Sequence, residues 1–396
     1  MISERMIAMT KSSSAIRAMF EEGMRLAAIH GSENVFDFSL GNPNFPAPAA
    51  LNRAIAQVLE DTDPTVVHGY MPNAGFPAVR TAVAENLNAR FGTAFTAENI
   101  LMTVGAAGGL NVILNVLLNP GDEVVVIAPY FLEYGNYIRN FGGVLRVVQA
   151  EEGTFQIDPA AVAAACNEKT KAVIVNNPNN PTGVIYPAET IRALAEALEA
   201  RQQELGTSIY LLSDEPYREL AYDGADVPYI PCFYRNTIVG YSWSKSMSLP
   251  GERIGYLVIP SEIDDYGLIW DAACTSNRIL GFVNAPSLLQ LAVARCLNEK
   301  TDISAYDRNR QALYNGLTAL GFECVYPRGA FYLWMKTPGD EKAFIEAAKR
   351  HCLLLVPGSS FAMPGYARLA YCVSPDRIAR SMPAFAQLAR EFGLGK

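Results

Sequence analysis

The sequence predicts an α/β protein built around a mostly parallel β-sheet with helices on both faces. Short runs rich in valine, isoleucine and leucine alternate along the chain with longer segments of helical periodicity. These runs are continuously apolar rather than alternately apolar and polar, which is typical of strands buried on both faces of a parallel sheet. The chain has 396 residues, half of them hydrophobic, and this length favours about two domains.

The central part of the chain carries the strand and helix patterns in strict alternation. Each apolar run is short enough for a strand, and the runs between them have the length and spacing of amphipathic helices. In order, the predicted elements are a strand at 99–104, a helix to residue 118, a strand at 123–128, a helix near 132–141, a strand at 171–176, a helix at 188–204 and strands at 208–215, 236–242 and 253–259.

Residues 48–285 are therefore predicted to form one large α/β domain. After Pro286, long helical patterns are followed by the apolar segments FECVYP, AFYLWMK, CLLLVPG and ARLAYCV. This order predicts a smaller α+β domain in residues 286–396. The N-terminal segment 1–47, with a helix expected around 15–29, is predicted to join this smaller domain.

Composition argues against several classes of function. The net charge of −8 does not suit a nucleic-acid partner, because a phosphate backbone requires a basic face. The sequence contains no run of about 18 apolar residues, which a membrane-spanning helix would need, and the N-terminus lacks the pattern of a signal peptide. We therefore expect a cytoplasmic location. Three separated histidines and seven single cysteines give neither a metal site nor a disulfide framework, and reduced thiols are expected.

Polar and small residues follow the predicted strands at the point where each strand ends. In open α/β sheets, ligands bind beyond the carboxyl ends of the strands, so these residues are expected to meet in one site. The segments, in order, are the small-residue run Gly105–Gly109, Pro129–Phe131, the motif NPNNPTG at 177–183, the motif Asp214-Glu-Pro-Tyr217 and the serine-rich turn around Lys245.

This set of residues suits one planar, phosphorylated aromatic aldehyde. Lys245 stands among serines without neighbouring carboxylates in the sequence, and an amine in a partly desolvated turn can form a Schiff base with an aldehyde. A carboxylate such as Asp214 can keep a pyridine nitrogen protonated, so that the ring withdraws electrons. A helix that begins with small residues offers backbone amides to a phosphate, and Arg253 can bind the same phosphate through two hydrogen bonds.

The same motifs resemble those of the class I/II aminotransferases, which belong to the fold-type I pyridoxal 5′-phosphate enzymes. The resemblance covers nearly the whole chain and includes LGNPNF, HGYMPNAGFPAVR, TVGAAGGL, APYF, NPNNPTG, SDEPY, SWSKSMSLPGERIGY and PGSSFAMPGYARLAY in this order. It implies a large domain with a mostly parallel seven-stranded sheet between helices, together with a smaller α+β domain. It also implies aspartate aminotransferase-like activity.

The resemblance implies a role for each cofactor-binding position. Lys245 is expected to hold the cofactor covalently and to carry the proton during the 1,3-transfer, and Asp214 is expected to pair with the pyridine nitrogen. Asn180 and Tyr217 are expected to bond the phenolate oxygen. The other implied contacts are stacking by Phe131 and phosphate binding by Ser242, Arg253 and the backbone amides of Ala106 and Ala107.

The resemblance also implies a shared active site in a homodimer. Tyr70 is expected to reach the phosphate bound by the neighbouring subunit. Arg368, the Gly41 backbone and Asn180 are expected to bind the α-carboxylate of the substrate. Arg278 lies in the region from which dicarboxylate-specific relatives present a second arginine to the partner's site, so we expect it to recognise a distal carboxylate.

Several of these positions have an alternative, purely structural interpretation. Arg368 can serve as an ion-pair partner, Phe131 as a core residue and Arg278 as a helix-surface arginine. Tyr134 and Tyr137 are interpreted as packing residues. At Ala107 some aspartate-preferring relatives have a lysine on the substrate side, and alanine cannot replace it.

The expected function is amino-group transfer between an L-amino acid, aspartate or a broader set, and a 2-oxo acid such as 2-oxoglutarate, by a ping-pong mechanism. One alternative is a carbon–sulfur β-lyase of the cystathionine type, which uses the same fold and lysine. The other is a non-enzymatic ligand-sensing regulator, which the acidic balance and the lack of length for a DNA-binding domain disfavour.

Overall fold

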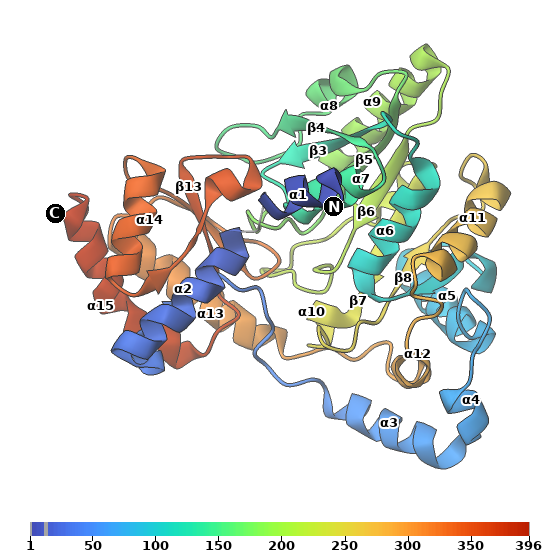
Figure 1. The fold of residues 1–396 in the computed structure, drawn as a ribbon, viewed down its shortest axis with the longest axis horizontal. Coiled ribbons are helices and arrows are strands. Elements are labelled where there is room, and N and C mark those ends of the chain that lie inside the picture. Colours follow the sequence, from blue (N-terminus) through green and yellow to red (C-terminus); the bar gives the residue numbers. More distant parts are fainter. Residues whose placement is uncertain (1, 12–14, 396) are drawn as a thin grey trace.

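The computed structural model describes residues 2–11 and 15–395 and contains a seven-stranded sheet (Figure 1). Neighbouring strands are parallel except for β8, which is antiparallel to both of its neighbours, so the predicted mostly parallel sheet between helices is confirmed. In spatial order the strands are β2 (Ile100–Thr103), β8 (Gly255–Val258), β7 (Thr237–Ser242), β6 (Tyr210–Asp214), β5 (Thr170–Asn176), β3 (Glu123–Ala128) and β4 (Val144–Gln149).

The predicted strands coincide with β2, β3, β5, β6, β7 and β8 to within two residues at either end. The strand β4 is not among the predicted ones. It lies at one edge of the sheet, where Val144 is 40% exposed and Val147 is 41% exposed. Unlike β2 at the opposite edge, which is fully buried, β4 is partly exposed, and its sequence VLRVVQ therefore lacks a continuous apolar run.

Helices cover both faces of this sheet. One face packs against α6, α7 and α11, and the other packs against α8 and α9 at one end and α5 and α12 at the other. The helices of this part are α3 (Ala49–Asp61), α4 (Pro64–His68), α5 (Pro77–Phe91), α6 (Gly105–Leu117), α7 (Glu133–Asn140), α8 (Pro159–Ala165), α9 (Ala188–Leu205), α10 (Trp243–Ser246), α11 (Tyr266–Ile279) and α12 (Ser287–Ala294).

A second, smaller α+β unit contains a four-stranded antiparallel sheet with the order β12-β13-β10-β9. Its core is built from the sheet and the helices α13, α14 and α15. The elements are α13 (Ile303–Ala319), β9 (Cys324–Val325), β10 (Tyr332–Lys336), α14 (Glu341–Arg350), β11 (Leu353–Leu354), β12 (Val356–Pro357), β13 (Tyr366–Ala370) and α15 (Pro375–Glu391), with short 3₁₀ turns elsewhere at Ser32–Asn34, Ala97–Asn99, Ile230–Cys232 and Gly358–Phe361.

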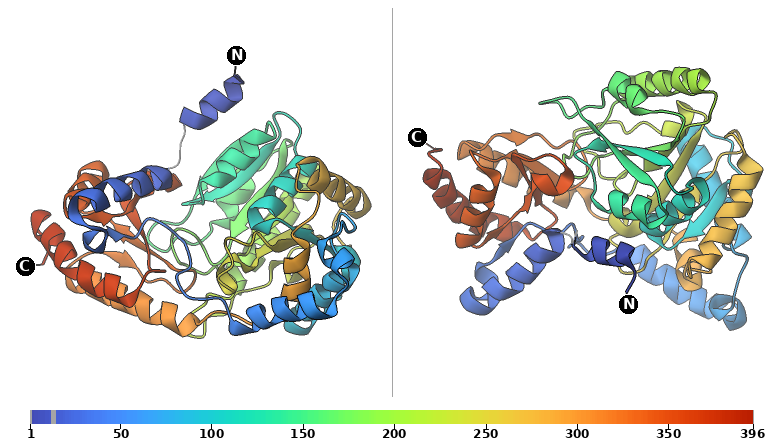
Figure 2. Two further views of the ribbon diagram at one scale, coloured as in Figure 1. Left: turned by 60° about the horizontal axis from the view of Figure 1, so that its bottom comes forward. Right: turned by 45° about the horizontal axis from the view of Figure 1, so that its top comes forward.

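The N-terminal segment is attached to this smaller unit. Strand β1 (Phe36–Asp37) pairs in parallel with β11, and the backbone amide of Ala370 donates to the carbonyl of Phe38 at 2.8 Å. Figure 2 shows α2 (Ala15–His30) beside the C-terminal elements, whereas α1 (Glu4–Lys11) stands apart from them.

We propose a division of the chain into the two predicted domains, residues 48–285 and residues 1–47 with 286–396, with one change: α12 (Ser287–Ala294) belongs to the larger domain. The separate sheets and the pairing of β1 with β11 support it. The helix α12 packs against α3 and α5, and this contact favours placing it with the larger domain. In the part of the chain that the structure describes, no helix is long and apolar enough to cross a membrane.

Candidate active site

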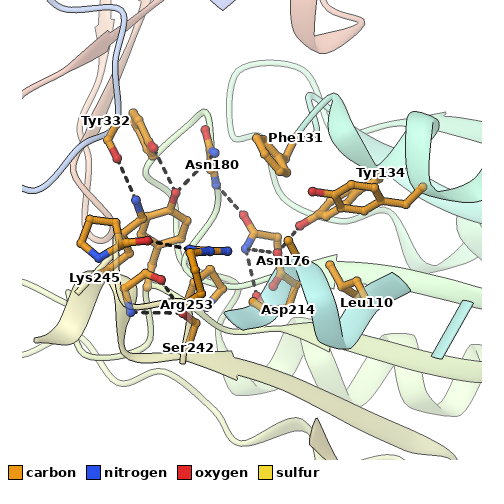
Figure 3. A pocket seen from close by; sticks show the side chains of 18 of the residues that line it. Leu110, Phe131, Tyr134, Asn176, Asn180, Asp214, Ser242, Lys245, Arg253 and Tyr332 are labelled. Carbon is orange, nitrogen blue, oxygen red and sulfur yellow. Dashed lines mark hydrogen bonds between the residues drawn. The ribbon is translucent and has the colours of Figure 1, made fainter. Parts of the chain in front are cut away.

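A cavity of about 290 Å³ opens at the carboxyl edge of the large sheet (Figure 3). The strands β2, β7, β6, β5 and β3 run in the same direction, so the residues that follow them meet at this edge. The smaller domain closes one side of the cavity with residues from β10 and β13. The lining residues are Gly41, Ala106, Ala107, Leu110, Phe131, Tyr134, Tyr137, Asn176, Asn180, Asp214, Pro216, Tyr217, Ser242, Ser244, Lys245, Pro250, Arg253, Tyr332 and Arg368.

Lys245 lies in the short helix α10, between the end of β7 and the start of β8. Its Nζ donates a hydrogen bond to the carbonyl of Gly41 at 2.7 Å and lies 5.4 Å from the centre of the Phe331 ring. Among the described residues, no carboxylate is close enough to form an ion pair with it. Burial, together with the smaller effect of the positive charges of Arg253 and Arg368, lowers the pKa of Lys245 to about 8.

This low pKa makes Lys245 reactive near neutral pH. At a pKa of about 8, about a tenth of the amine is unprotonated at pH 7, against well below 0.1% at the ordinary lysine pKa near 10.4. In the cofactor-free protein, acetylation of Lys245 by acetic anhydride is therefore expected to rise with pH around a midpoint near 8, read by peptide mass spectrometry. The same peptide in the urea-unfolded protein is the control, and a folded-state midpoint equal to the unfolded one would contradict the assignment.

Asp214 is the last residue of β6 and is buried. Its Oδ2 accepts hydrogen bonds from the Tyr134 hydroxyl at 2.5 Å and from Asn176 Nδ2 at 3.5 Å. Its Oδ1 is buried without a hydrogen-bond partner. Burial raises the pKa of Asp214 to about 7, although the hydrogen bond from Tyr134 acts in the opposite direction.

A hydrogen-bonded network joins the two domains across the cavity. The hydroxyls of Tyr217 and Tyr332 are 3.0 Å apart, and Asn180 Nδ2 donates to the Tyr217 hydroxyl at 3.5 Å. Arg368 on β13 is 1% exposed and donates to Asn180 Oδ1 at 3.1 Å and to the Ser39 carbonyl at 2.6 Å. Its Nε is buried without a partner, which leaves a buried cation able to bind a carboxylate.

The opposite end of the cavity is suited to an anion. Helix α6 begins at Gly105, and its first backbone amides have no partner within the helix. Gly105 has φ +69°, and a Cβ there would lie 2.9 Å from Arg253 Nη2. The small side chains of Ala106 and Ala107 leave this helix end open, and the hydroxyls of Ser242 and Ser244 lie 2.6 Å apart on the facing side.

These groups fit the pyridoxal 5′-phosphate that the sequence resemblance implies. The unpartnered Oδ1 of Asp214 requires a donor, as a protonated ring nitrogen would provide. The amine of Lys245 suits the aldehyde, and the donors Asn180 and Tyr217 suit the phenolate oxygen. The open start of α6, with Arg253 beside it, suits the phosphate. The cavity therefore has a matching group for each polar part of the cofactor.

Two of the predicted site residues do not line this cavity. Tyr70 follows α4, is 93% exposed and lines a separate surface depression with Met71, Phe282 and neighbouring residues. Arg278, near the end of α11, is also exposed. A single chain therefore brings neither side chain to the site, and their expected roles depend on a second copy.

The structure corrects the interpretation of Tyr134 and Tyr137 as packing residues alone. Both line the cavity, and Tyr134 makes the hydrogen bond to Asp214. Phe131 also lines the cavity, with its ring centre 5.6 Å from that of Tyr134 in an edge-to-face arrangement. Sequence analysis also missed Asn176 and Tyr332. The position of Asn176 as the last residue of a buried strand was an available signal, but Tyr332 comes from the smaller domain and has no local signal.

Comparison with known proteins gives consistent results. The family described as "Aminotransferase class I and II" matches residues 33–384. The aspartate/prephenate aminotransferase of Thermus thermophilus is 34% identical over 355 residues, which cover 88% of this chain and 89% of that protein. The aspartate aminotransferase of Pyrococcus horikoshii is 29% identical, with 96% and 95% covered.

Solved structures also resemble the whole chain. An amino transferase from Eubacterium rectale is 44% identical with a TM-score of 0.96, and 99% of each chain is covered. The aspartate aminotransferase of Thermus thermophilus, solved with maleate, is 31% identical with a TM-score of 0.86, and 98% of this chain and 99% of that one are covered.

Proposed function

Because the chain belongs to the class I and II aminotransferases and is a pyridoxal 5′-phosphate-dependent aminotransferase, we propose that the cavity around Lys245 is its active site. One observation carries this proposal: the cavity brings together a neutralisable amine, a carboxylate oxygen without a partner and a buried guanidinium with a free N–H. These are the groups needed by an aldehyde, a ring nitrogen and an amino-acid carboxylate. The names of the similar proteins favour aminotransferase activity over the lyase and regulator alternatives.

The proposed mechanism assigns the proton transfer to Lys245. When bound, the cofactor supplies an electron-withdrawing ring that stabilises the negative charge left on the α-carbon of the amino acid. Lys245 Nζ, in its unprotonated form, takes the α-proton and later gives a proton back. Its hydrogen bond to the Gly41 carbonyl holds Nζ at the side of the cavity that the smaller domain closes.

The other side chains bind and orient. Asp214 is proposed to face the ring nitrogen, Asn180 and Tyr217 the phenolate oxygen, and Phe131 the ring face. Arg253, Ser242 and the backbone amides of Ala106 and Ala107 are proposed to bind the phosphate.

We propose L-aspartate among the amino-group donors and 2-oxoglutarate as an acceptor. One similar protein is named aspartate/prephenate aminotransferase and another aspartate aminotransferase, which supports the donor. Among the described residues, the cations that line the cavity are Lys245, Arg253 and Arg368, and each already has a role. A second carboxylate therefore needs a cation from another copy of the chain.

We propose that this copy is the second subunit of a homodimer, which contributes Tyr70 and Arg278. Both side chains are exposed in the single chain, Tyr70 to 93%, and are therefore accessible to another copy, which supports the proposal. The mass of the protein in solution, measured by sedimentation, tests the dimer. The expected cytoplasmic location stays a prediction.

Replacing Arg278 with alanine tests the origin of substrate preference. The loss of a desolvated guanidinium–carboxylate pair is expected to lower kcat/KM for aspartate by roughly 30-fold or more, without affecting phenylalanine. Arg308→Ala, on the surface of α13, is the matched control. Steady-state assays with 2-oxoglutarate measure both amino acids, and an unchanged ratio of the two kcat/KM values would remove Arg278 from the site.

A further inference from the structure

The two oxygens of the Asp214 carboxylate have different surroundings. Oδ2 accepts the hydroxyl of Tyr134 and Nδ2 of Asn176, so two donors from two different elements converge on one atom. Oδ1 is buried and has no hydrogen-bond partner. A carboxylate held in this way can rotate little, because any rotation would break the bonds at Oδ2.

Tyr134 reaches Asp214 from outside the strand layer. It lies on α7, which follows β3, and its side chain is 2% exposed. The ring centres of Tyr130 and Phe131 lie 6.5 Å and 5.6 Å from its own, so the phenol has little freedom of position. Figure 3 shows its hydroxyl directed at Asp214.

Tyr137 provides an internal comparison on the same helix. It also lines the cavity and is desolvated, but its hydroxyl makes no hydrogen bond to Asp214. Residues three apart on a helix lie on the same side. The two tyrosines therefore lie on the same side of α7, but Tyr137 is only partly buried and lacks the bond to the carboxylate.

We propose that Tyr134 is a positioning residue that acts through Asp214, fixing Oδ2 so that Oδ1 is presented as a charged acceptor to the ring nitrogen of the cofactor. This inference rests on the proposed function of the cavity. It assigns Tyr134 no contact with the substrate or the cofactor.

The electrostatics of the pair agree with this role. A phenol that donates to a carboxylate favours the charged form of the carboxylate. Burial, and the neighbouring negative charge of Glu215, act in the opposite direction by raising the pKa of Asp214, whereas the hydrogen bond from Tyr134 lowers it. Burial and the charge of Asp214 raise the pKa of Tyr134, so the proton stays on the phenol and the bond keeps its direction.

The test compares two ligands that differ only at the ring nitrogen. One is pyridoxal 5′-phosphate, and the other is its analogue with a carbon–hydrogen group in place of that nitrogen. Their dissociation constants are measured on the full-length, cofactor-depleted protein with no substitution, with Tyr134→Phe and with Tyr137→Phe. The ratio of the two constants within each variant reports the contribution of the ring nitrogen, and a general folding defect cancels from it.

The unsubstituted protein and Tyr137→Phe are expected to prefer pyridoxal 5′-phosphate over the analogue, and Tyr134→Phe is expected to lose about tenfold or more of that preference, since it lacks a hydrogen bond to a charged group. The affinity for the analogue is expected to stay unchanged. Tyr134→Met, which also lacks a donor, replaces the phenylalanine variant if that protein does not fold.

Three outcomes would overturn parts of the account. If Tyr134→Phe keeps the full preference, Tyr134 does not act through Asp214. If it weakens both ligands equally, Tyr134 has a structural role only, and the proposed active site still stands. If the unsubstituted protein binds neither ligand, the proposed function of the cavity fails together with the inference.

Discussion

Replacing Lys245 with alanine is expected to lower the rate of amino-group transfer by at least about 10⁴-fold, because one side chain supplies both covalent binding of the cofactor and the proton transfer. No other amine among the described residues lines the cavity. Single-turnover formation of 2-oxo acid from an L-amino acid measures the effect. Lys342→Ala, an exposed lysine on α14, is the matched control and is expected to change nothing.

Lys245→Arg distinguishes the effect of the positive charge from the effect of an amine that can lose its proton. Arginine keeps the positive charge but does not lose its proton near neutral pH, so it is expected to be as inactive as alanine. Borohydride treatment of the unsubstituted protein is expected to fix the cofactor to the peptide that contains Lys245. Full activity in either variant, or cofactor attached to another lysine, would contradict the assignment.

Replacing Asp214 with asparagine is expected to lower the same rate by about 10²–10³-fold, the usual effect of removing one preorganised charged group from an active site. An amide has nearly the same shape as the carboxylate, but it cannot hold a proton on the ring nitrogen by charge. Asp271→Asn, an exposed position on α11, is the control. A loss of less than tenfold would show that Asp214 does not face the ring nitrogen.

The same substitution is expected to stabilise the cofactor-free protein at high pH. The folded-state pKa of Asp214 is raised to about 7, above the ordinary value near 3.9, so its contribution to stability is full below pH 3.9 and is lost as the pH rises to 7. Asparagine does not titrate. The variant is therefore expected to gain, relative to the unsubstituted protein, on the order of a few kcal/mol in free energy of unfolding between pH 5 and pH 8.

Urea unfolding of both cofactor-free proteins at the two pH values measures this gain. If the two proteins differ by the same free energy of unfolding at pH 5 and at pH 8, Asp214 is not a desolvated carboxylate. Bound cofactor is expected to reduce the difference, since a cationic ring nitrogen lowers the pKa of the carboxylate.

The large sheet could be predicted from the sequence because its central strands are buried on both faces. Runs such as EVVVIA and KAVIVN mark β3 and β5 without any knowledge of the partners. The antiparallel direction of β8 and the edge strand β4 could not be predicted in the same way. Direction depends on the connection around Lys245, and β4 is partly exposed.

The site could be predicted where its residues follow strand ends. Lys245 and Asn180 follow β7 and β5, and Asp214 is the last residue of β6, so local patterns and a common sheet edge bring them together. The network from Tyr217 through Tyr332 to Arg368 depends on how the smaller domain docks, and no local pattern encodes that contact. The sequence did not predict the role of Tyr134, because its spacing from Phe131 is that of a packed helix face. Its hydroxyl instead donates a hydrogen bond to Asp214.

The most direct test of the account adds an L-amino acid, with no 2-oxo acid, to the purified protein carrying its cofactor. The account predicts one equivalent of 2-oxo acid per subunit, with the cofactor recovered as pyridoxamine 5′-phosphate, and no product from Lys245→Ala. Continuous release of pyruvate and ammonia from cystathionine, with the cofactor unchanged, would contradict amino-group transfer and support the β-lyase alternative.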